Sequence, residues 1–147
     1  MKMNIKLLSF LALSFVVIFS SCKKDDDPSA EEQKIEELSG TWNIVGANVL
    51  DEDLTGIEIS FTASNTTYSV SGLAAFTDAN LNHSEVLAES GSFSLNENLD
   101  VVTLSPGGDL TIGNINKETG DLTLSYTASY PKATDDATNI TLSLELQ

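Results

Sequence analysis

The chain has 147 residues, and its formal net charge of −15 at pH 7 arises from 22 acidic residues against seven lysines and no arginine. This charge excludes nucleic acid as a partner, because binding to phosphates requires cationic side chains. It equally disfavours electrostatic docking on anionic lipid headgroups. A single cysteine excludes an internal disulfide, so the stability of the folded part has to come from the burial of apolar side chains.

The first 22 residues have the layout of an export signal. Lys2 and Lys6 precede an uncharged apolar run over residues 7–19, and two serines stand directly before Cys22. As a helix this run would be about 20 Å long, which is shorter than the hydrocarbon core of a bilayer at about 30 Å. We therefore interpret residues 1–21 as a signal peptide that is removed from the mature protein.

The position of Cys22 indicates which kind of signal this is. Small residues directly before a lone cysteine resemble the processing site of bacterial lipoproteins, apart from Phe19, where an aliphatic residue is usual. The resemblance implies a diacylglyceryl group on Cys22, so that acyl chains supply the contact with the membrane. A plain secretory signal is the alternative, but it would leave an unpaired thiol in an exported protein.

Residues 22–37 are expected to form an acidic tether followed by a short helix. Removal of both signal-peptide lysines takes the formal charge from −15 to about −17. The Lys-Asp-Asp-Asp sequence at residues 24–27 resembles the signal that sends some Gram-negative lipoproteins to the outer face of the outer membrane, although it could equally be a plain spacer. Ser29 and Glu32 are spaced as in a capping box, and Gly40 is placed to end the helix.

From Thr41 onward the apolar residues recur with a period of two. Half-buried antiparallel strands require this alternation because successive side chains point to opposite faces of the sheet. Turn-forming residues separate the segments, which is typical of hairpin connections. The segments expected to be strands are residues 42–50, 57–61, 66–71, 86–95, 101–105, 110–116, 122–126 and 140–147, and residues 72–83 and 130–137 are expected to be loops.

Eight short antiparallel strands form either a closed barrel or a sandwich of two sheets. Residues 38–42, Leu-Ser-Gly-Thr-Trp, resemble the G-x-W start of the lipocalin family and its bacterial lipocalin-like relatives. Residues 91–95, 110–116 and 122–126 fit the order of that family as well. The resemblance spans residues 38–147. It implies an all-β, eight-stranded, up-and-down barrel in which Trp42 packs across the closed end.

The resemblance has two departures. Lipocalins usually cover this tryptophan with an arginine from late in the chain, and they carry a Thr-Asp-Tyr corner; this chain has neither. The barrel is therefore better supported than membership of the ligand-binding core of the family. Aromatic residues on the expected strands would line or fill the interior, and the candidate ligand-lining residues are Trp42, Phe61, Tyr68, Phe93 and Tyr126.

The residues needed for catalysis or metal binding are sparse. His83 is the only histidine and lies in a polar segment, so we expect a solvated loop residue with no Ser–His nucleophile and no zinc set. Residues 51–56 resemble the start of an EF-hand loop, but Thr62 stands where the bidentate glutamate is needed, so a hairpin turn is preferred to a calcium site. We expect no enzyme, no metal and no cofactor.

The sequence leaves two classes of function open. The first is a lipid-anchored, monomeric protein of the outer membrane, facing the cell surface, whose barrel binds a small apolar ligand or a partner. The second is a structural or adhesion-type β domain with a packed interior. An interior ligand should be neutral, because the chain lacks arginine and both lysines beyond the helix, Lys117 and Lys132, fall in expected loops.

Overall fold

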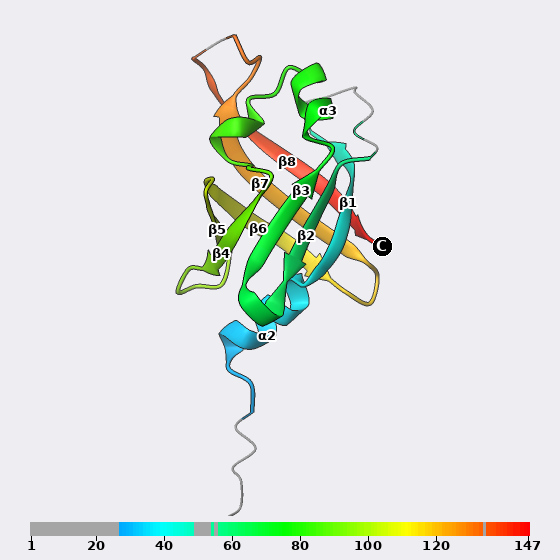
Figure 1. Cartoon of the computed structure of the whole chain (residues 1–147), viewed down its shortest axis with the longest axis vertical. Coiled ribbons are helices and arrows are strands. Elements are labelled where there is room, and N and C mark those ends of the chain that lie inside the picture. Colours follow the sequence, from blue (N-terminus) through cyan, green and yellow to red (C-terminus); the bar gives the residue numbers. More distant parts are fainter. Residues whose placement is uncertain (1–26, 49–53, 55, 134) are drawn as a thin grey trace, which may run out of the picture.

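The computed structural model describes residues 27–48, 54, 56–133 and 135–147 (Figure 1). In these residues the chain forms a closed barrel of eight antiparallel strands, each paired with its neighbour in sequence, and β1 also pairs with β8. The prediction of an up-and-down barrel is confirmed, and the sandwich is excluded. The strands are β1 Gly40–Ala47, β2 Glu58–Thr62, β3 Thr67–Ser71, β4 Ser90–Leu95, β5 Val101–Ser105, β6 Asp109–Asn116, β7 Asp121–Ser129 and β8 Ala137–Leu146.

The two-residue period of the sequence is what separates the inside of the barrel from the outside. In β8, Ile140, Leu142 and Leu144 are buried, while the residues between them are exposed or half-buried. Register shifts in β1, between Ile44 and Gly46, and in β6 interrupt the pairing. Such bulges increase the local bend of a strand, which a sheet needs in order to close on itself.

A helix precedes the barrel as predicted. Helix α2 spans Ala30–Leu38 and begins with the expected capping box. Ser29 N donates to Glu32 Oε2 at 2.7 Å, and Glu32 N donates to Ser29 Oγ at 3.1 Å. The hydrogen bond from the Ser29 backbone to the Glu32 carboxylate, and then the Ser29 side chain, lower the pKa of Glu32. Figure 1 shows α2 against one end of the barrel, with residues 27–29 leading away from the strands.

The connection between β3 and β4 differs from the prediction. Residues 86–89 are not strand, since β4 begins at Ser90, and the expected loop at residues 72–83 contains the helix α3, Leu73–Asp78. The 3-10 turn η2, His83–Glu85, follows. Figure 1 places α3 at the end of the barrel opposite α2. We refer to residues 72–89 as the cover.

Burial at the barrel end explains the structure of the cover. Phe76, Leu81 and Leu87 are at most 2 % exposed and join the same apolar cluster as the strands. Phe76 lies on α3, whereas Leu81 and Leu87 lie in irregular chain before and after η2, so the cover reaches the core through several short segments and not through one regular element. The hairpin turn predicted at residues 51–56 lies mostly outside the described residues.

Candidate functional site

All five aromatic residues proposed from the sequence point into the barrel. Trp42 lies on β1, Phe61 on β2, Tyr68 on β3, Phe93 on β4 and Tyr126 on β7, and each is at most 4 % exposed. They belong to one apolar cluster. Their role as ligand-lining residues stays a prediction, since the same burial would serve a packed interior.

Trp42 closes the α2 end of the barrel. Its side chain is fully buried, and its indole Nε1 donates a hydrogen bond of 2.7 Å to the carbonyl oxygen of Leu38, the last residue of α2. Gly40 precedes Trp42 on β1, and its backbone is what favours glycine, because its φ of +139° is a conformation that other residues rarely adopt. A Cβ there would lie 2.8 Å from Leu146 Cδ1, at the flexible end of that side chain, and 3.9 Å from Trp42 Nε1.

A lysine binds the C-terminus of the same helix. Lys117 Nζ, from the turn between β6 and β7, donates to Glu36 O at 2.6 Å and to Ser39 Oγ at 3.3 Å. A cation at the end of a helix is favourable because the carbonyl groups there carry a partial negative charge. The arginine that lipocalins place over this tryptophan has no counterpart in the sequence. Lys117 brings a positive charge to this end of the barrel and contacts the last turn of α2.

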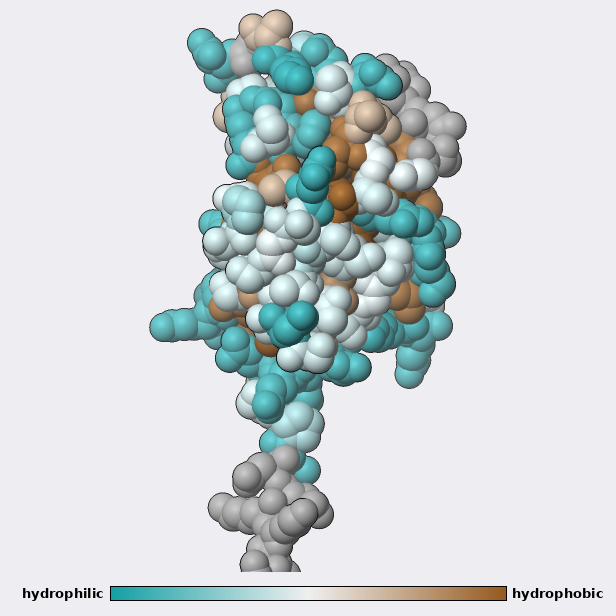
Figure 2. All heavy atoms as spheres, viewed as in Figure 1, coloured by the Kyte–Doolittle hydropathy of each residue, from teal (hydrophilic) through white to brown (hydrophobic). Residues whose placement is uncertain are grey.

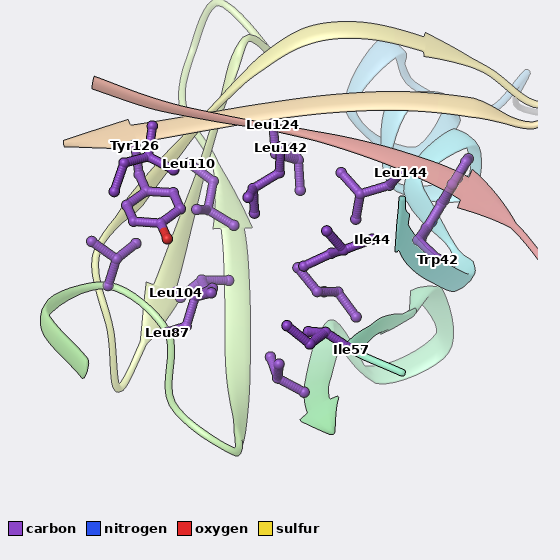
Figure 3. Packing of buried hydrophobic residues seen from close by; sticks show 14 of the residues in the cluster. Trp42, Ile44, Ile57, Leu87, Leu104, Leu110, Leu124, Tyr126, Leu142 and Leu144 are labelled. Carbon is purple, nitrogen blue, oxygen red and sulfur yellow. The ribbon is translucent and has the colours of Figure 1, made fainter. Parts of the chain in front are cut away.

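The middle of the barrel is filled by apolar side chains. Phe61 and Phe93 meet edge to face, with ring centroids 5.2 Å apart and an interplanar angle of 80°. Figure 3 shows that labelled apolar side chains run from Trp42 at one end of the interior to Tyr126 at the other. Leu124 and Leu142 lie between them and are fully buried. No charged side chain is buried in the part of the chain that the structure describes.

Two inward tyrosines differ in how their hydroxyl groups are satisfied. Tyr68 donates to the carbonyl oxygen of Pro106, in the turn between β5 and β6. The hydroxyl of Tyr126 is buried, and it has no hydrogen-bond partner among the described residues. Burial raises the pKa of both groups, so both hydroxyls keep their protons at neutral pH. Tyr126 therefore presents a buried donor that nothing in the described chain accepts.

His83 lies in the cover and is less solvated than the sequence suggested. Its ring stacks on Phe76 with centroids 5.3 Å apart, and its Nδ1 atom is buried without a partner in the described part of the chain. Burial, and then the charge of Lys132, lower its pKa. The expectation of a solvated loop residue holds only in part: His83 lies in η2 between two regular elements, and it is half-buried because its ring packs on Phe76. The expectation that His83 takes no part in Ser–His chemistry stays a prediction.

Three hollows of the described surface lie outside the barrel wall. An open groove of about 1030 Å³ runs along α2 and is lined in part by Ile35, Ala63 and Lys117. A hollow of about 600 Å³ lies over outward residues of β6 to β8, and one of about 340 Å³ lies between the start of α2 and the turn between β4 and β5. Of the five interior aromatics, Tyr126 alone borders one of these three hollows.

Comparison with known proteins assigns this chain to no family. The chain matches no protein-family model, and no curated protein is significantly similar to it. Among the described residues no helix has the length and apolar character needed to cross a membrane. The same residues contain no group of three or more potential metal ligands.

Proposed function

We propose that this protein is a lipid-anchored lipoprotein of the outer membrane, exposed at the cell surface, whose lipocalin-like barrel binds a small neutral apolar molecule. The observation that carries the ligand class is the interior wall, which consists of apolar side chains with no buried charge in the described residues. Burying an ion among such side chains without a partner costs several kcal/mol. The anchor rests on Cys22 and its sequence context, which lie outside the described residues.

The arrangement of the two barrel ends supports this proposal. Residues 27–29 leave α2 on the side away from the strands, and the cover lies at the opposite end (Figure 1). An anchor upstream of residue 27 would therefore face the α2 end toward the membrane and the cover away from it. A ligand arriving from the medium would meet the cover first.

The ligand class can be tested by calorimetric titration of the unacylated mature protein. Oleate and an uncharged alcohol of equal chain length should be compared at pH 7.5. We expect the alcohol to bind and oleate to bind more weakly, since the acidic domain repels anions and offers no arginine to hold a carboxylate. Tighter binding of oleate would contradict the proposal.

A structural or adhesion-type domain is the second candidate, and one surface feature favours it. The outer faces of β1 to β4 carry hydroxyl side chains in register, as in the row Thr41, Ser60, Ser69 and Ser90. Figure 2 shows this face largely as a region of intermediate hydropathy. Apart from Glu58, the outward residues of β2 to β4 are uncharged, and such a face on so acidic a protein would suit contact with a neutral surface. Failure of both the alcohol and oleate to bind would favour this candidate.

A further inference from the structure

The two ends of the barrel are closed by different kinds of contact. At the α2 end, polar groups pair: Trp42 Nε1 with Leu38 O at 2.7 Å, and Lys117 Nζ with Glu36 O at 2.6 Å. At the cover end, two buried polar atoms have no partner among the described residues, the Tyr126 hydroxyl and His83 Nδ1. The unsatisfied groups thus gather at one end, the one closed by the cover.

The cover is bonded to neighbouring loops, and its contribution to the interior is apolar. Gly108 N donates to Val86 O at 2.9 Å, and Lys132 N donates to Asn80 O at 2.9 Å. Toward the interior the cover presents Phe76, Leu81 and Leu87, all buried. These side chains occupy the end of the barrel without binding the Tyr126 hydroxyl. An apolar molecule of similar size could replace them there.

The Tyr126 hydroxyl specifies the chemistry of such a molecule. The residue is 3 % exposed, and Figure 3 shows its hydroxyl directed inward, on the side where Leu87 and Leu104 lie. An unsatisfied buried hydroxyl destabilises a fold, and a phenylalanine would fill the same space without that penalty. The hydroxyl keeps its proton, and this unused donor is satisfied only by a hydrogen-bond acceptor.

We propose that the cover end of the barrel binds a neutral, elongated, apolar molecule with one acceptor oxygen, such as a ketone or ester carbonyl, which accepts a hydrogen bond from the Tyr126 hydroxyl. The apolar part takes the place of the cover's inward side chains beside Leu104 and Leu110. This inference rests on the proposed ligand-binding function and adds to it a site, a donor and the acceptor that the ligand has to carry.

The test compares two molecules of equal size on three proteins. Methyl nonyl ketone carries the acceptor, and dodecene, with the same number of heavy atoms, lacks it. Both compete for binding with the neutral fluorophore phenylnaphthylamine. The proteins are the full mature chain made unacylated by Cys22→Ser, the same chain with Tyr126→Phe, and the matched control with Tyr130→Phe. Tyr130 is the control because it follows the end of β7, is only partly buried and is not one of the candidate ligand-lining residues. Circular dichroism and cooperative unfolding establish that each variant is folded.

We expect the parent protein and Tyr130→Phe to bind the ketone about threefold to tenfold more tightly than dodecene, as one net hydrogen bond provides. In Tyr126→Phe this preference should disappear, while binding of dodecene stays unchanged. Equal affinity for both molecules in the parent, or a preference that survives Tyr126→Phe, overturns the inference but leaves the proposed function standing. If the fluorophore, ketone and dodecene all fail to bind the parent, the inference and the proposed ligand-binding function both fail.

Discussion

The indole nitrogen of Trp42 donates to the carbonyl oxygen of Leu38 across 2.7 Å, joining the first strand of the barrel to the last residue of α2. Both side chains are fully buried. This bond satisfies one of the carbonyl groups that a helix leaves free at its C-terminus. It also explains how the helix holds its position at the end of the barrel, because its last turn is tied to a residue inside the wall.

Replacement of Trp42 should show that its ring and its N–H contribute separately to the stability of the protein. Trp42→Ala should lower the free energy of unfolding by about 3–5 kcal/mol, as large aromatic truncations do. Trp42→Phe keeps an aromatic ring but loses the bond to Leu38, and it should cost less than the alanine variant. Urea unfolding followed by circular dichroism measures both. Emission of the wild-type indole typical of full exposure to water would contradict its burial.

Substitution of the two inward tyrosines by phenylalanine should affect the free energy of unfolding differently. Tyr68→Phe removes a donor bound to Pro106 and should lower the free energy of unfolding by about 1 kcal/mol. Tyr126→Phe removes an unpartnered buried hydroxyl and should leave the unliganded protein as stable or raise its stability by about 1 kcal/mol. Urea unfolding of both variants measures this. A clear loss of stability in Tyr126→Phe would show that its hydroxyl is satisfied in the unliganded protein.

His83 should make the stability dependent on pH in the mildly acidic range. Its pKa in the folded protein is lowered from 6.5 by burial and then by Lys132, so folding favours the neutral ring. The unfolded chain binds the proton more readily, and stability is therefore lost as the pH falls below about 6.5 toward the lowered pKa. His83→Phe keeps an aromatic ring beside Phe76 and removes the titration. The free energy of unfolding should differ less between pH 7.5 and pH 5.5 for this variant than for the wild type. An equal difference in both proteins would show that His83 is not the source of the pH dependence.

Cys22→Ala tests the anchor. The substitution removes the sulfur that would carry the diacylglyceryl group, so the product should be soluble or remain as unprocessed precursor. Partitioning between detergent and aqueous phases measures the change. Lys23→Ala is the matched control, and it should partition like the wild type because it leaves the cysteine intact. Unaltered partitioning of Cys22→Ala into detergent would exclude the lipoprotein assignment.

The strands, the capping box and the closing tryptophan could be recognised in the sequence because each depends on short-range patterns. A period of two between apolar residues is enough to specify a half-buried strand, and it identified segments that match all eight strands of the described barrel. The bonds between Ser29 and Glu32 join residues three apart, so their spacing alone predicts them. The G-x-W pattern led to Trp42, although its bond to Leu38 and the role of Lys117 were not foreseen.

What the tertiary structure decided depends on contacts between distant segments. Residues 72–83 of the cover have neither a clear helical nor a clear strand pattern in the sequence, and residues 86–89 were predicted as the start of a strand that begins at Ser90. The apolar residues of the cover are buried because they pack against the end of the barrel. The hydrogen bonding of the two inward tyrosines also depends on distant segments, because their alternating positions in the sequence predict only that they point inward. Tyr68 reaches Pro106 because strand register brings the turn between β5 and β6 beside it, while Tyr126 faces apolar side chains. A hydrogen bond requires a partner at a defined distance and angle, and only the closed barrel sets both.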